Sequence, residues 1–144
     1  MFFGEYEHSI DDKSRLTLPA RFRDAFADGV VLTRGIDSCL DVFARADWYA
    51  RVEERLAPLD PLSKEARQLM RHLFAAGTDA ALDKQGRVLV PPALVTYAGL
   101  GREAVVAGVR DHLEIWNRTS WAAQVTSFEG SADDVAERLA DKRL

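Results

Sequence analysis

The feature that most constrains this chain is an internal repeat, because two copies of one unit must fold in related ways. Residues 11–19 (DDKSRLTLP) return in the second half of the chain as residues 83–91 (DKQGRVLVP). A second block, residues 40–43 (LDVF), returns as residues 113–116 (LEIW). The spacing between copies is one residue longer for the second block, which is what an insertion in a loop would leave. The shared order of the blocks predicts two tandem units within the 144 residues.

Each unit follows the same pattern of elements. A short strand enters a tight turn, an alternating strand leaves it, a short helix follows, and a strand pair and an amphipathic helix complete the unit. In the first unit we expect strands at residues 6–10, 15–18, 30–33 and 40–43 and a short helix at residues 20–27. In the second unit we expect strands at residues 78–82, 87–90, 104–107 and 113–116 and a short helix at residues 92–98. This βαββα-type pattern predicts an α+β fold.

The longer helices are expected where apolar side chains recur at helical spacing. The helices that close the units carry Trp48, Val52 and Leu56 in the first and Trp121, Val125 and Phe128 in the second, where Asn117 is the expected N-cap. A connecting helix carries Ala66, Leu69, Met70, Leu73 and Phe74. The expected divisions are a first unit at residues 1–57, a connecting helix at 58–77, a second unit at 78–128 and a C-terminal helix or tail at 129–144.

The turns of the two units differ at one position. Asp11 and Asp83 open the turns, where an aspartate can hydrogen-bond its own backbone. Gly86 ends the second turn and can take a left-handed conformation without strain, whereas Ser14 stands at the same place in the first turn. A non-glycine residue in that conformation costs ~1 kcal/mol or slightly more. We therefore expect the first turn to be somewhat altered.

Composition excludes several classes of protein. The net charge of −4 and the sequence pI of about 5.4 argue against a binder that holds nucleic acid with its whole surface. Neither a membrane-spanning run nor a signal peptide is expected. The single cysteine, Cys39, fits a reducing cytosol, and with His8, His72 and His112 it offers no paired metal-ligand spacing. No nucleophile–base pair or glycine-rich phosphate loop is present, so we expect no enzyme, metal or cofactor.

The two signatures resemble those of the MraZ family. The resemblance rests on residues 1–6 (MFFGEY), 10–23 (IDDKSRLTLPARFR), 83–91 and 113–116, and on the helix that carries Arg67 and Arg71. It covers roughly residues 1–128. It implies an AbrB-like fold, in which two units of one chain, with flanking helices, form a swapped-hairpin β-barrel.

The resemblance also implies a function and partners. MraZ-like proteins form ring-shaped homo-oligomers, for which an octamer is the expected size, and they bind short G-containing direct repeats in double-stranded DNA. The repeats lie upstream of the division and cell-wall gene cluster, whose first gene is their own. The implied role is that of a cytoplasmic, nucleoid-associated transcription regulator, with repression the expected direction and no membrane partner.

The expected DNA contacts lie on the turns and the segments that follow them. Residues 12–23 contain four basic side chains and one acidic one, a local charge of +3. On a β-ribbon in the major groove, Arg15 can pair with guanine, while Lys13, Arg21 and Arg23 suit phosphates. The second unit contributes Lys84 and Arg87, and we expect the first unit to carry more of the contact. The plainer alternative is that Arg15 and Arg87 only pair with the turn aspartates, and that the other basic residues are solvated surface charges.

Four residues are assigned to a subunit interface. Arg67 and Arg71 form one helix face, for which simple exposure or pairing with Glu65 or Asp60 is the alternative. Phe2 and Phe3 are expected to pack against a neighbouring subunit or in the barrel. Trp48 and Trp121 are expected in the core, Trp116 in the core or an interface, and Cys39 at least half-buried.

Two alternative functions remain open. An antitoxin of the same barrel fold would usually have one unit and a long disordered tail, whereas this chain has two units and a short tail. A ring-forming protein that binds only other proteins would show no preference for DNA.

Overall fold

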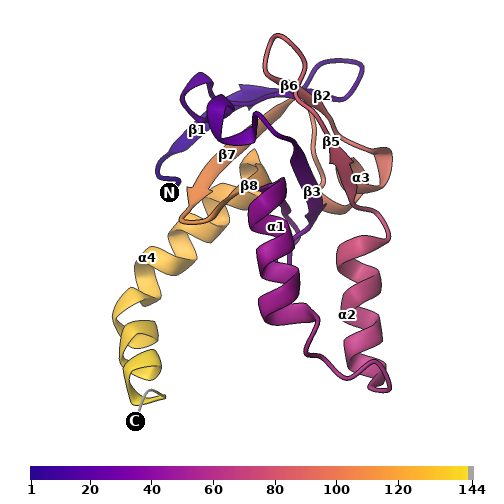
Figure 1. Cartoon of the computed structure of the whole chain (residues 1–144). Coiled ribbons are helices and arrows are strands. Elements are labelled where there is room, and N and C mark those ends of the chain that lie inside the picture. The colour runs from indigo at the N-terminus through magenta and orange to yellow at the C-terminus, as the bar shows by residue number, and fades with distance from the viewer. Residues whose placement is uncertain (143–144) are drawn as a thin grey trace.

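The strands of the chain form antiparallel sheets, and its long helices all lie on one side of them (Figure 1). The computed structural model describes residues 1–142. The first half contributes β1 (Glu5–Ser9), β2 (Arg15–Thr17), the 3₁₀-helix η1 (Ala20–Phe26), β3 (Val30–Arg34), β4 (Leu40–Ala44), α1 (Arg45–Arg51) and the π-helical η2 (Val52–Leu56). The second half contributes α2 (Lys64–Phe74), β5 (Thr78–Ala80), β6 (Arg87–Leu89), α3 (Pro92–Ala98), β7 (Glu103–Val109), β8 (His112–Asn117) and α4 (Arg118–Asp141). The predicted α+β class is confirmed.

The two halves exchange strands. One sheet has the order β1-β7-β8-β4-β3-β5, and a separate two-stranded sheet joins β2 to β6. The first-half strand β1 pairs with β7, and the second-half strand β5 pairs with β3. Neither half could complete its sheet alone, because each needs a strand of the other.

Equivalent residues of the repeat meet at two places. Leu16 pairs with Val88, its counterpart in the first repeated block, and Asp41 pairs with Glu114, its counterpart in the second. An approximate two-fold axis therefore passes between β2 and β6 and between β4 and β8.

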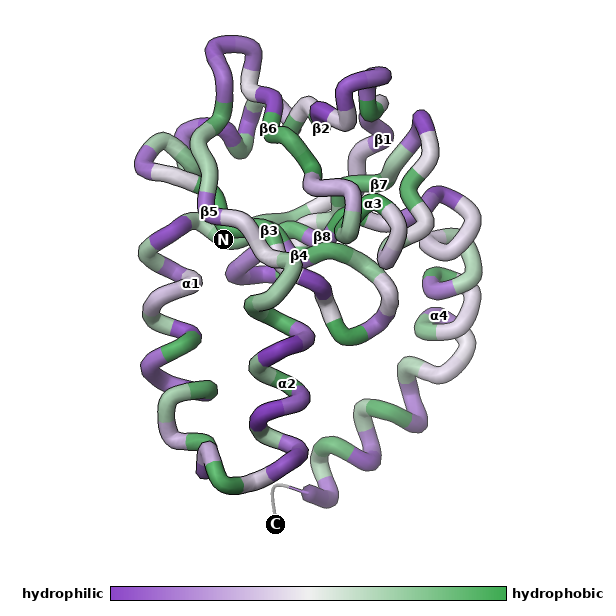
Figure 2. Tube along the Cα trace, turned by 90° about the vertical axis from the view of Figure 1, so that its right-hand side faces the viewer, coloured by the Kyte–Doolittle hydropathy of each residue, from purple (hydrophilic) through white to green (hydrophobic). Residues whose placement is uncertain are grey.

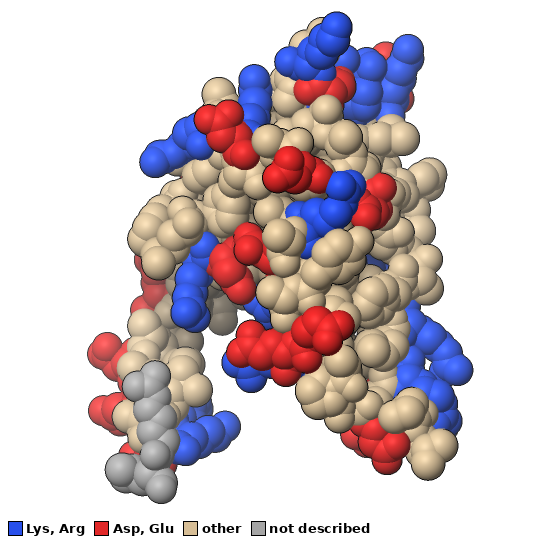
Figure 3. Space-filling view, in the orientation of Figure 1, with Lys and Arg blue, Asp and Glu red and all other residues tan. Residues whose placement is uncertain are grey.

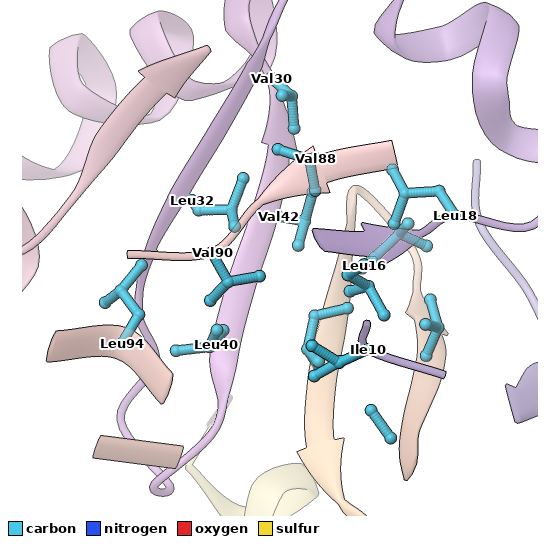
Figure 4. Packing of buried hydrophobic residues seen from close by; sticks show 14 of the residues in the cluster. Ile10, Leu16, Leu18, Val30, Leu32, Leu40, Val42, Val88, Val90 and Leu94 are labelled. Atoms are coloured by element: carbon cyan, nitrogen blue, oxygen red, sulfur yellow. The ribbon is translucent and has the colours of Figure 1, made fainter. Parts of the chain in front are cut away.

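The main core lies between the two sheets. Figure 4 shows side chains of both halves converging there, among them Leu16, Val42, Val88 and Val90. Leu16, Val42 and Val90 are fully buried. Because each such side chain contributes about 1.5–3 kcal/mol when fully buried, this shared core also joins the halves energetically.

The longer helices cover the other face of the larger sheet. Helices α1 and α2 pack on β3 and β4 around Phe43, Trp48 and Leu73, and α4 begins beside β7 and β8, where Trp121 contacts Trp116. Figure 2 shows hydrophobic and hydrophilic residues alternating along α2, as the predicted amphipathic stripe requires. None of the helices among residues 1–142 has the length and apolarity to span a bilayer.

Two details of the predicted elements are wrong. Residues 118–141 form one helix, α4, not a closing helix and a separate tail helix. A single glycine inside a helix costs only about 1 kcal/mol, so Gly130 does not end it. Trp121 is half-buried, not in the core, because α4 leaves the sheet soon after it begins. The short helix predicted after Pro19 is present as the 3₁₀-helix η1, and Asn117 caps α4 as predicted, its side chain accepting from Ser120 N at 3.1 Å.

Candidate nucleic-acid interface

The two-stranded sheet of β2 and β6, here called the ribbon, lies at the end of the molecule away from the long helices (Figure 1). The turns of residues 11–15 and 83–87 project beside it. Figure 3 shows Lys and Arg side chains gathered at this end with a few acidic ones between them, whereas both kinds are scattered over the rest of the visible face. The overall acidity of the chain therefore does not extend to this surface.

The two turns have the same hydrogen bonds. In the first, Asp11 Oδ1 accepts from the backbone N–H groups of Lys13 (3.0 Å) and Arg15 (2.9 Å). In the second, Asp83 Oδ1 accepts from Gln85 and Arg87 in the same way, at 2.9 Å each. The carboxylate of each aspartate thus stabilises its own turn by accepting two backbone hydrogen bonds.

The expected alteration of the first turn is wrong. Ser14 has φ of 59° and Gly86 has φ of 74°, so both adopt the left-handed conformation. Their N–H groups donate to the carbonyls of Asp11 (2.9 Å) and Asp83 (3.0 Å). The first turn keeps its geometry because the aspartate bonds and the ribbon outweigh a strain of about 1 kcal/mol.

Each turn aspartate also holds an arginine. Arg15 Nε donates to Asp11 Oδ2 and Arg87 Nε donates to Asp83 Oδ2, both at 2.7 Å. The backbone N–H of Arg15 lowers the pKa of Asp11, and that of Arg87 lowers the pKa of Asp83. Both carboxylates therefore stay ionised near neutral pH. The pairing of both arginines with the turn aspartates, which the plainer alternative requires, is thus present.

The pairing leaves part of each guanidinium for another partner. Only Nε of Arg15 makes a hydrogen bond among the described residues, so both of its terminal amino groups remain for a ligand. The end of Arg87 is more engaged, with Nη2 3.4 Å from Gln85 Oε1 and Nη1 3.9 Å from Asp11 Oδ2. An arginine held at Nε loses less conformational freedom when its free edge binds.

The outward face of the ribbon includes two residues that the sequence reasoning missed. Arg15 lies opposite Leu89, and Thr17 lies opposite Arg87, while Leu16 and Val88 point into the core. Leu89 is 59% exposed, which is unusual for a leucine on a strand. Strand alternation could have identified Thr17 and Leu89, since each lies two positions from an arginine.

The other predicted basic residues divide into free and engaged side chains. Lys13 and Lys84 are exposed at the turns. Arg21 is also exposed, and its Nη1 donates to the Tyr6 hydroxyl at 2.7 Å. Arg23 instead lies against Gly86 and donates to the Leu18 carbonyl at 3.2 Å. Its side chain therefore stabilises the second turn and the end of β2.

The residues assigned to a subunit interface do not lie together. Phe2 is buried in the core of its own chain, 5.3 Å from the Phe22 ring centroid, whereas Phe3 is 67% exposed. Arg67 and Arg71 lie at a groove of about 370 Å³ between η2 and α2. Arg67 donates to the carbonyls of Pro61 and Leu62 and thereby fixes the loop before α2.

Comparison with known proteins agrees with this arrangement. The sequence model of the family described as "MraZ protein, putative antitoxin-like" matches twice, over residues 1–71 and 73–143. A protein of Roseiflexus castenholzii named "Transcriptional regulator MraZ" is 47% identical over 144 residues, all of both chains. Proteins of the same name from Thermomicrobium roseum and Pediococcus pentosaceus are 46% and 42% identical, over 97% and 98% of this chain and 98% of each relative. The chain therefore belongs to the MraZ family.

Proposed function

We propose that this chain is a DNA-binding transcriptional regulator that reads duplex DNA with the outward face of the ribbon. The observation that carries the proposal is the pair of arginines, Arg15 and Arg87, fixed by turn aspartates on a basic end of an acidic molecule. The relatives named transcriptional regulators support it. The fold that fits this role is the swapped-hairpin barrel of AbrB-like proteins, with residues 1–57 and 78–128 as its units.

The chemistry of the ribbon suits base recognition in the major groove. A two-stranded antiparallel ribbon fits that groove. The free edge of Arg15 can donate two hydrogen bonds to O6 and N7 of guanine, which is worth about 1–3 kcal/mol of discrimination. Leu89, beside it on the partner strand, can contact a thymine methyl group. Lys13, Lys84 and Arg21 carry charge toward phosphates and add affinity but little selectivity.

A single acidic subunit should bind DNA weakly, so the proposal includes a ring of identical subunits. An octamer could place several ribbons on successive direct repeats, and the affinity of their simultaneous binding would exceed the affinity of one ribbon. We place Phe3, Arg67 and Arg71 at the contacts between subunits. The targets we propose are G-containing direct repeats upstream of the protein's own gene and the adjoining division and cell-wall genes. In this proposal the protein represses these genes, and it acts in the cytoplasm at the nucleoid.

The test is a fluorescence-anisotropy titration of the full chain. The labelled DNA is the fragment upstream of its own gene, an unrelated fragment of equal length is the comparison, and the series covers several salt concentrations. We expect selective binding that weakens steeply with salt. Arg15→Ala should lose the selectivity, while Arg138→Ala, the same charge change on α4 far from the ribbon, should keep it. Equal binding of both fragments by wild type would refute base reading, and no binding would point to a ring that binds only proteins.

A further inference from the structure

We propose that Cys39, Asp41, His112 and Glu114 form a binding site for a divalent transition-metal ion, with Zn²⁺ the best match. The Cys39 sulfur and carboxylate oxygens of Asp41 and Glu114 lie within 4.8 Å of one another. His112 Nε2 lies 3.6 Å from an oxygen of Asp41 and 3.6 Å from one of Glu114. The site is distinct from the ribbon and independent of the proposed function.

The approximate two-fold axis creates this cluster. Asp41 and Glu114 are directly opposed on β4 and β8, and Cys39 and His112, which each lie two positions before them, are equivalent positions of the repeat. The strand alternation turns Asp41 and Glu114 to the side of the larger sheet that carries the helices, away from the main core. They lie between the apolar groups under α1 and α4. The spacing along the sequence hid the cluster, because its members meet only when the halves pair.

Part of the cluster already has the spacing of a four-coordinate ion. Bonds of about 2.0–2.3 Å in a tetrahedral site place neighbouring ligand atoms about 3.3–3.8 Å apart. The two distances from His112 already fall within that range. Cys39, Asp41 and Glu114 form one group within 4.8 Å and His112 lies at its edge, so side chains would have to move for all four to bind one ion. Zinc accepts thiolate, imidazole and carboxylate ligands, whereas magnesium and calcium prefer oxygen ligands, so this donor set favours zinc.

Neighbouring groups orient the ligands as in known metal sites. His112 Nδ1 lies 2.7 Å from Asp111 Oδ1, which can hold a proton on Nδ1, so that Nε2 would offer its lone pair to the cluster once a bound ion displaces the Nε2 proton. Trp116 Nε1 donates to one oxygen of Glu114 at 2.9 Å and leaves the other oxygen toward His112. A metal-bound histidine almost always has such a second partner.

Burial makes a bound cation favourable. Cys39 is 2% exposed, and the side chains of His112 and Asp41 are 12% and 20% exposed. Negative charge here is therefore poorly solvated, and an ion would replace the thiol proton, which leaves to solvent. Beside Asp41 on β3, the Thr33 hydroxyl is buried and has no hydrogen-bond partner among residues 1–142.

An ion could enter from one side. A cleft of about 970 Å³ beside α1 is lined by His112 and Asp111 together with Arg51, Asp47 and Glu54. Once bound, the ion would link β4 of the first half to β8 of the second. The expected consequence is a structural one, a firmer junction between the halves at the face opposite the ribbon.

The test uses the full chain, stripped of metal with a chelator and kept reduced. Titration with Co²⁺ should give a saturable thiolate-to-cobalt absorption band at one ion per chain, which Zn²⁺ then displaces. Because Cys39 is the only cysteine, that band can come from no other residue. Zn²⁺ should also raise the melting temperature.

Variants distinguish a specific metal site from non-specific binding of the ion. His112→Gln and Glu114→Gln should each weaken binding by at least about tenfold, and Asp111→Asn by about tenfold through the orientation of His112. His8→Gln, a histidine change on β1 outside the cluster, should leave it unchanged. Circular dichroism checks that each variant is folded. Absence of the band in wild type, or equal affinity in folded His112→Gln and Glu114→Gln, would overturn the proposal.

Discussion

Replacement of Gly86 by alanine should destabilise the protein, because two features of the second turn require glycine. Gly86 has φ of 74°, in the left-handed region, where a Cβ strains the backbone. A Cβ at this position would also overlap Arg23 Nε and lie 2.5 Å from Arg23 Cδ. The Arg23 side chain would have to move and release its hydrogen bond to the Leu18 carbonyl.

The size of the effect follows from these two costs. The strained conformation costs about 1–2 kcal/mol, and the lost hydrogen bond costs about 0.5–1.5 kcal/mol. The smaller conformational entropy of alanine in the unfolded chain returns about 0.4–1 kcal/mol. The free energy of unfolding should therefore fall by about 2 kcal/mol, which for a chain of this length lowers the melting temperature by about 4–8 °C.

Denaturant unfolding measured at one fixed protein concentration is the assay. Gly101→Ala is the matched control, because a Cβ there would meet nothing within 4 Å, and it should change the free energy by no more than about 0.5 kcal/mol. In a double-mutant cycle, Arg23→Ala should remove part of the cost of Gly86→Ala. A loss for Gly86→Ala no larger than that for Gly101→Ala, or no coupling to Arg23, would refute the reasoning.

Three further predictions concern the turns and the assembly. Ser14→Gly should raise the free energy of unfolding by about 0.5–1 kcal/mol, because the relieved left-handed strain of about 1–2 kcal/mol exceeds the about 0.4–1 kcal/mol that glycine's freedom in the unfolded chain costs. Denaturant unfolding measures this, and an unchanged or lower midpoint contradicts it. The pKa values of Asp11 and Asp83 are lowered in the folded state, so the two ionised carboxylates stabilise the fold fully above about pH 4, and this contribution is lost as pH falls through their folded pKa values. In melting experiments across that pH range, the variant with both aspartates changed to asparagine should lose less stability than wild type. Arg67→Glu with Arg71→Glu should reduce the oligomer seen by light scattering and weaken operator binding in parallel, whereas operator binding by a monomer at full strength would exclude the ring mechanism.

Local features of this chain were predictable from its sequence. The turn aspartates act on amides two and four residues away, so their pattern alone fixes the geometry around Asp11 and Asp83. The strands and the amphipathic α2 follow from the spacing of apolar residues in the same way. The repeat also placed the two arginines at equivalent positions.

Features that depend on contacts between distant segments were not predictable in this way. The length of α4 escaped because the apolar pattern weakens beyond Phe128 while the backbone continues without support from the sheet. The Cys39–His112 cluster escaped because its residues lie in different halves of the chain and meet only through the pairing of β4 with β8. The engagement of Arg23 with Gly86 likewise joins one half to the turn of the other.

The most direct test of base reading by the ribbon compares Arg15→Lys with Lys13→Ala on the upstream and unrelated DNA fragments at several salt concentrations. Lysine keeps the charge of Arg15 but cannot donate two parallel hydrogen bonds as the guanidinium does. Arg15→Lys should therefore lower the ratio of the two affinities by at least about tenfold and leave the salt dependence unchanged. Lys13→Ala should weaken both fragments equally and flatten the salt dependence. If Arg15→Lys keeps the full ratio, Arg15 contacts phosphate and the proposed reading of guanine is wrong.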